Sequence, residues 1–157
     1  MQFALTFLFV NIIGFIIYYV YPAAPPWYIQ NYGFQFNPHI HGNTAGLQRF
    51  DNFFHVSIFH ALYAQSSNVF AAMPSLHSAY PLITLFYGIK NRLGPINILF
   101  AVIMLGIWFA AIYTGHHYIL DVLAGIACSA AGIFIFKKWL VPNKYFYNFF
   151  FKKLISY

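Results

Sequence analysis

Charged residues are almost absent from this sequence of 157 residues. Only 6% of the residues are charged, compared with about 25% in average soluble proteins, and 61% are apolar. This composition excludes an ordinary soluble domain and indicates an integral membrane protein. The length suits one domain, residues 1–157, without room for a separate soluble module.

Acidic residues are the scarcest of the charged ones. The chain has two of them against eight lysines and arginines, which gives a net charge of +6. In a soluble protein this balance would suggest a nucleic-acid partner. Here the lysines lie at the ends of apolar runs, so they indicate lipid headgroups and membrane topology, and we expect no nucleic-acid partner.

Cysteine and clustered metal ligands are also missing. The single cysteine, Cys128, excludes an intrachain disulfide, and its small neighbours indicate a packing role between membrane helices. His39, His41, His55 and His60 have no carboxylate or cysteine among them at a convincing spacing. A metal site, and with it a histidine-rich oxidative metalloenzyme, is therefore disfavoured, and we expect no cofactor.

Four apolar runs approach the length of about 20 residues that a membrane-spanning helix needs. They cover approximately residues 3–20, 96–113 and 118–136, together with a second run that has Pro74 in its first helical turn and ends at about residue 89. The first run lacks the basic start and the cleavage site of a secretory signal, so we expect it to be retained as a span. The sequence thus predicts an all-α, polytopic helix bundle with about four membrane spans.

The segments between and after the spans have their own patterns. Three prolines in residues 22–28 predict a rigid loop, whose aromatic residues would also suit the wall of a lipid cleft. Residues 30–49 are polar and predict an extramembrane loop. Apolar residues at four-residue steps from Arg49 to Ala64 predict one interfacial helix, and residues 137–157 predict a tail along the membrane surface.

The distribution of lysine and arginine predicts the orientation of the bundle, because these residues accumulate in cytosolic loops. With four spans, all of them except Arg49 fall on one side of the membrane. The Pro-rich loop, the start of the second span and residues 113–125 then share the opposite, non-cytosolic face.

A histidine pair and one of the two acids lie at the mouth of the last span. A carboxylate there is costly unless it is paired, and His117, four residues before Asp121, would lie on the same helix face. Asp121 would fix the tautomer of His117 and leave the other ring nitrogen free as a base or nucleophile. The alternative is that Asp121 only caps the helix and that His117 is a solvated loop residue.

The start of the second span, Met73–His77, predicts an anion site, because a helix N-terminus presents unpaired N–H groups. Ser75 adds a hydroxyl donor there. His77 and His117 suit a two-step displacement, in which one imidazole attacks while the other protonates the leaving group and then activates the acceptor. An anion site beside a histidine nucleophile suggests phosphoryl transfer, for which no metal is required.

These residues also carry a family resemblance. The motifs PSLHS (74–78) and GHHYILD (115–121) resemble the second and third signatures of the type 2 phosphatidic acid phosphatase (PAP2) superfamily. Four segments are similar to the branch that contains the inositol phosphorylceramide synthases: PAAPPWY (22–28), GLQRFD (46–51), AMPSLH (72–77) and YTGHHY (113–118). The resemblance covers about residues 20–126.

The resemblance implies a covalent phosphohistidine mechanism. His117 would be the nucleophile, Asp121 its orienting partner, and His77 the general acid and later the base for the incoming water or alcohol. Ser75 would hold phosphate oxygens, whereas His116 would either contact the phosphate or bond to water. The implied function is a lipid phosphotransferase acting on a phospholipid or sphingolipid; the alternatives are a lipid phosphate phosphatase and a truncated, non-catalytic membrane protein.

The sequence departs from the family pattern in two respects. The Lys and the Arg-Pro of the usual first signature are absent, and Ala111 replaces the usual Arg before the third-signature His, so we assign phosphate binding to Arg49. An ion pair with Asp51 or a contact with a lipid headgroup is the alternative for Arg49. Relatives typically have six core spans, so this chain would lack the first two, as a truncated product, a distinct short form, or part of a homo-oligomer completed by another copy.

Overall fold

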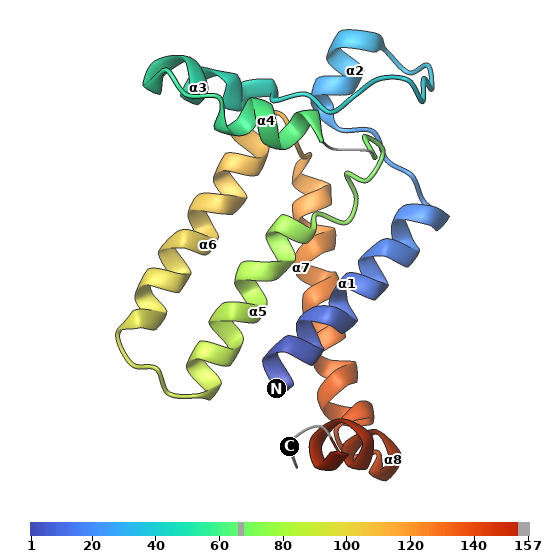
Figure 1. The fold of residues 1–157 in the computed structure, drawn as a ribbon, viewed down its shortest axis with the longest axis vertical. Coiled ribbons are helices and arrows are strands. Elements are labelled where there is room, and N and C mark those ends of the chain that lie inside the picture. The colour runs from blue at the N-terminus through green and yellow to red at the C-terminus, as the bar shows by residue number, and fades with distance from the viewer. Residues whose placement is uncertain (66–67, 154–157) are drawn as a thin grey trace.

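The computed structural model describes residues 1–65 and 68–153, and within them it has eight α-helices and no β-strand. Four long helices form an upright bundle, while the short helices gather at its two ends (Figure 1). This confirms the predicted all-α bundle. The helices are α1 (Gln2–Val20), α2 (Pro26–Tyr32), α3 (Gln48–Phe54), α4 (Ile58–Ala64), α5 (Leu76–Lys90), α6 (Ile96–Tyr113), α7 (Ile119–Ile135) and α8 (Lys144–Tyr147).

Three of the bundle helices are long and apolar enough to cross a membrane. These are α1, α6 and α7, the last of which continues through a π-helical turn to Leu140. The fourth expected span, α5, has 15 residues and packs against α1, α6 and α7. Three of the four predicted spans are therefore long and apolar enough to cross a membrane, and the fourth, α5, is a shorter helix between them.

The core lies where α1, α5 and α7 meet. Val10, Ala79 and Ile83 are fully buried there, and Cys128 is buried beside them, as its small neighbours predicted. Gly132 lets α7 approach α1 closely, because a Cβ at this position would lie 2.5 Å from Val10. Close approach of small residues is how helices associate in lipid, since lipid tails are as apolar as leucine.

The turn before α5 is fixed to the first turn of α7. The Ser75 N–H donates to the carbonyl oxygen of Asp121 at 2.9 Å, and this contact joins the two signature motifs. Gly125 makes it possible, because a Cβ there would overlap the carbonyl oxygen of Ser75.

We expect Gly125→Ala to lower the free energy of unfolding by about 1–3 kcal/mol, because the added methyl forces α5 and α7 apart. The measurement is thermal unfolding of the protein in detergent. Gly106→Ala on α6 is the matched control, since nothing lies within 4 Å of a Cβ at that position. Equal melting temperatures for the two variants would contradict the expectation.

The prediction of one interfacial helix from Arg49 to Ala64 is wrong. The chain forms two helices, α3 and α4, because His55 adopts a left-handed conformation with φ of 53° and ends the first. The Asp51 carboxylate then accepts hydrogen bonds from the N–H groups of Phe59, at 3.2 Å, and His60, at 2.8 Å. Asp51 thus caps the start of α4 and folds it back beside α3 across the end of the bundle (Figure 1).

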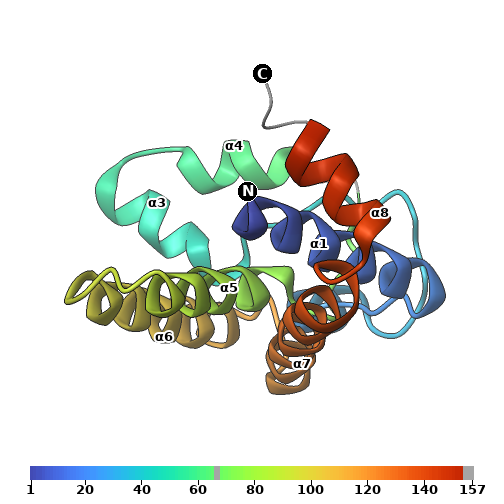
Figure 2. The ribbon, with the colours of Figure 1, turned by 90° about the horizontal axis from the view of Figure 1, so that it is seen from below.

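The two ends of the bundle differ in charge. Lys90 and Arg92 lie at or after the end of α5, Lys137 and Lys138 lie after the end of α7, and Lys144 begins α8. All of these segments are at the end opposite α2, α3 and α4 (Figure 1). Helix α8 is at the same end as the lysines and lies across the bundle beside α1 (Figures 1 and 2). This separation agrees with the four-helix topology. Residues 154–157 of the predicted surface tail lie outside the described residues.

Candidate functional site

Four loop segments meet at the end of the bundle that carries α2, α3 and α4. They are joined by backbone hydrogen bonds between segments that are distant in sequence. These bonds are Ala72 N–H to Ala23 O at 3.2 Å, Trp27 N–H to Gly115 O at 3.1 Å and Gly46 N–H to Thr114 O at 2.9 Å. The Pro-rich loop, the polar loop and both signature motifs therefore lie together, as the topology predicted.

His77 and His117 are neighbours in space. His77 is in the first turn of α5, and His117 follows α6, where its N–H donates to the carbonyl oxygen of Ala111 at 3.0 Å. The two ring centroids are 6.1 Å apart, and the ring planes are inclined by 53°. A phosphoryl group about 3–3.5 Å from a nitrogen of one ring can therefore also reach the other ring.

Asp121 caps a helix, which is one of the two roles between which the sequence left a choice, and it also faces His117. Its Oδ2 accepts the N–H of Tyr118 at 2.8 Å and so caps α7, and the same oxygen lies 3.7 Å from His117 Nδ1. The side chain is buried, since the residue is 3% exposed. The predicted reason for the pairing is wrong, however, because α7 begins at Ile119 and His117 lies in the loop before it.

The Nδ1 atom of His117 is buried and has no hydrogen-bond partner among the described residues. The Asp121 carboxylate at 3.7 Å is the acceptor that it faces. This arrangement favours the tautomer with the proton on Nδ1, which leaves the lone pair of Nε2 free.

Ser75 faces the protein interior instead of presenting its hydroxyl as an anion donor. The residue is 0% exposed, and its Oγ accepts a hydrogen bond from the Ser78 hydroxyl at 3.1 Å. Its N–H is also used, in the contact with Asp121. At the start of α5, the N–H groups of Leu76 and His77 are the ones without an intrahelical acceptor.

His116 contacts protein at both ring nitrogens, which differs from both predicted roles. Nδ1 lies 2.9 Å from the Thr114 hydroxyl, and Nε2 lies 3.3 Å from the carbonyl oxygen of Asn43. Burial lowers the pKa of His116 to about 4, although the hydrogen bond to Asn43 opposes this shift. The ring is therefore neutral at physiological pH, and with Tyr63, whose ring centroid is 4.6 Å away, it holds the polar loop and α4 over the site.

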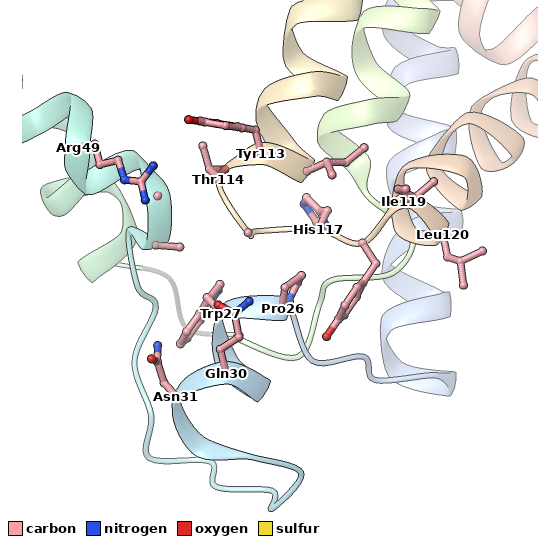
Figure 3. Close-up of a pocket in the computed structure, with 15 residues that line it drawn as sticks. Pro26, Trp27, Gln30, Asn31, Arg49, Tyr113, Thr114, His117, Ile119 and Leu120 are labelled. Atoms are coloured by element: carbon pink, nitrogen blue, oxygen red, sulfur yellow. The ribbon is translucent and has the colours of Figure 1, made fainter.

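Arg49 lies on α3 at the wall of a cavity of about 720 Å³ that also reaches His117 (Figure 3). It forms no ion pair with any residue in 1–65 and 68–153, and Asp51 is turned away to cap α4. The predicted alternative, an ion pair with Asp51, is therefore not formed. The rest of this wall includes Gln30 and Asn31, which belong to α2 and not to the loop predicted for residues 30–49.

His77 lines a second, apolar cavity between α5 and α6. It has a volume of about 470 Å³, and its walls include Pro81, Phe100, Ile103 and Ile107. A smaller cavity of about 220 Å³ is lined by both His77 and His117. His117 thus lines the cavity that contains Arg49, His77 lines the apolar cavity, and both line the smaller one.

Metal-ligating side chains are not clustered in the part of the chain that the structure describes. No group of three or more His, Cys, Asp or Glu residues there could hold a metal ion.

The comparisons with known proteins agree on one family. The sequence profile of the PAP2 superfamily matches residues 1–135. The phosphoinositol dihydroceramide synthase of Bacteroides thetaiotaomicron is 53% identical over 151 residues, which are 96% of this chain and 50% of that protein. No solved structure gives a significant match.

Two fungal proteins are also similar. The catalytic subunit of inositol phosphorylceramide synthase from Saccharomyces cerevisiae is 36% identical over 124 residues, covering 77% of this chain and 30% of that protein. The inositol phosphorylceramide synthase of Candida albicans is 31% identical over 148 residues, covering 91% of this chain and 31% of that protein. The chain therefore spans about half the length of the bacterial relative and about a third of the fungal ones.

Proposed function

The chain belongs to the PAP2 superfamily, and from this premise we propose that it is a membrane lipid phosphotransferase of the inositol phosphorylceramide synthase type, acting through a phosphohistidine. The observation that carries the proposal is the meeting of His77 and His117, whose ring centroids lie 6.1 Å apart, with Asp121 buried behind His117. The named relatives supply the substrate class: a phosphoinositol group and a ceramide acceptor.

In the first step, His117 Nε2 attacks the phosphorus of the donor lipid. A P–N bond forms, the P–O bond to the lipid alcohol breaks, and His77 gives its proton to the departing oxygen. The imidazolium that forms at His117 is stabilised by the Asp121 carboxylate, which is 3.7 Å from Nδ1. Arg49, on the wall of the same cavity, offsets charge on the phosphate oxygens.

In the second step, His77 is neutral and takes the proton of the acceptor hydroxyl. The acceptor oxygen attacks phosphorus, the P–N bond breaks, and both histidines return to their starting states. We place this chemistry at the non-cytosolic surface, because the lysine-bearing segments are at the opposite end of the bundle.

Hydrolysis to water is the second candidate function, because three exposed polar residues, Gln30, Asn31 and Arg49, line the cavity of about 720 Å³ that reaches His117. It shares the first step and differs only in the acceptor. The test is incubation of purified protein with headgroup-labelled phosphatidylinositol, with and without ceramide. We expect label in a sphingolipid only when ceramide is present; release of soluble phosphate ester that no alcohol affects would reject the transferase proposal.

We expect Asp121→Asn to reduce transfer by about 10²–10⁴-fold while the fold is kept. The amide oxygen still accepts the Tyr118 N–H, so the cap of α7 remains, but the negative charge facing His117 is lost. The measurement is the rate of transfer in vesicles, together with the melting temperature.

Asp51→Asn is the matched control, because Asp51 is the only other acid and also caps a helix. It should retain activity within severalfold. Similar losses in the two variants would mean that Asp121 acts only as a cap.

A further inference from the structure

The cavity of about 720 Å³ that is lined by Arg49 and His117 has no carboxylate in its wall. The chain contains only two acidic residues. Asp51 is 2% exposed and its two oxygens accept the N–H groups of Phe59 and His60, while Asp121 is buried behind His117. Arg49 is therefore the only charged side chain among the residues that line this cavity, and its charge is positive.

Two amide side chains, those of Gln30 and Asn31, face the same cavity from α2, across from Arg49 (Figure 3). Both residues are exposed, and neither side chain hydrogen-bonds to any other residue in 1–65 and 68–153. An amide offers two donors and an acceptor, which matches the hydroxyl groups of a polyol, since each hydroxyl both donates and accepts.

Helix α2 holds these amides in place. Trp27 N–H donates to the carbonyl oxygen of Gly115, which lies two residues before His117. The Tyr28 hydroxyl donates to the carbonyl oxygen of Gln35 at 2.6 Å and accepts the N–H of Asn37 at 3.0 Å. The unpaired amides therefore belong to an element that is tied both to the signature loop and to its own following turn.

A cationic headgroup has no carboxylate to pair with in this cavity. Three aromatic residues that could contact a quaternary ammonium group line the wall, Trp27, Tyr113 and Tyr118, and two of them already pack against protein. Trp27 is buried, and the ring of Tyr113 stacks on Phe109, with the two centroids 5.4 Å apart. The positive charge of Arg49 would also repel a choline or ethanolamine group.

We propose that Gln30 and Asn31 bind the headgroup of the donor lipid and select an uncharged polyol over a cationic amine. This inference rests on the proposed function, and it adds the residues that determine donor specificity. The cavity volume of about 720 Å³ lies within the range of small-molecule sites, so it can hold a ring-sized headgroup beside His117.

The test measures headgroup binding apart from turnover. The protein in detergent is titrated with glycerophosphoinositol and with glycerophosphocholine, which are the two soluble headgroups without their acyl chains. We expect tighter binding of the polyol, and we expect Gln30→Leu and Asn31→Leu each to weaken it about two- to tenfold, because each loses hydrogen bonds to hydroxyl groups. Gln35→Leu is the matched control, because this residue is exposed after α2 but does not line the cavity.

A second variant tests whether the charge in the cavity determines which headgroup is preferred. Gln30→Glu places a carboxylate in the cavity and should raise the affinity for glycerophosphocholine relative to glycerophosphoinositol. Equal binding of both headgroups by the unaltered protein, or equal effects of Gln30→Leu and Gln35→Leu, would overturn the inference. Selective binding without any transfer to ceramide would instead retain the inference and reject the proposed function.

Discussion

Replacing His117 with alanine should reduce phosphotransfer by about 10³-fold or more and abolish the phosphoenzyme. In the proposed mechanism no other group forms the P–N bond, and removal of a nucleophile costs about as much as removal of the whole catalytic set. The measurement is a rapid quench with donor lipid labelled in its phosphate, under alkaline conditions that preserve phosphohistidine. The fold should persist, because the His117 side chain makes no hydrogen bond among the described residues.

The adjacent histidine is the matched control for this experiment. His116→Gln removes a ring that contacts Thr114, Asn43 and Tyr63, so it should lower the melting temperature more than His117→Ala does. It should nevertheless still form phosphoenzyme. Labelled phosphohistidine in the His117→Ala protein would show that the nucleophile is elsewhere.

Much of the architecture could be predicted because it depends on local patterns. The apolar runs at 3–20, 96–113 and 118–136 correspond to the three helices long enough to span a membrane. The predicted four-span topology places nearly all lysines and arginines at one end of the bundle and the Pro-rich loop and both signature motifs at the other. That topology brings His77 next to His117, although the two residues are 40 positions apart in a chain of 157.

The rest depends on tertiary contacts that leave no local signal. The break at His55 is stabilised by Asp51, whose carboxylate accepts the N–H groups of Phe59 and His60 in the first turn of α4. Ser75 looks like an exposed donor in the motif, but α7 packs onto it at Gly125 and buries it. Gln30 cannot be recognised as a cavity residue from the sequence, because the cavity forms only where α2, α3 and residues 112–120 meet.

Both acidic residues cap helices, and this affects the site as a whole. Both acidic side chains are buried, so neither is exposed to solvent and neither lines the cavity that contains Arg49. Asp121 caps α7 and also faces His117, whereas Asp51 only caps α4. The electrostatics of the site are therefore set by one buried carboxylate, one exposed arginine and two imidazoles.

Replacing His77 with alanine should slow the first step by about 10²–10⁴-fold when the leaving group is a lipid alcohol. An alkoxide is a poor leaving group unless it is protonated as the P–O bond breaks. His77 is suited to donate that proton, because its ring lies 6.1 Å from that of His117 and lines the apolar cavity between α5 and α6.

A donor in which para-nitrophenol replaces the lipid alcohol separates this role from a structural one, because nitrophenolate leaves without a proton. The burst of nitrophenolate reports the first step alone, so it does not depend on His77 acting later as a base for the acceptor. We expect His77→Ala to retain most of this burst while losing transfer from the natural donor. A structural role for His77 would instead lower both rates by the same factor, since a displaced His117 would attack either donor poorly.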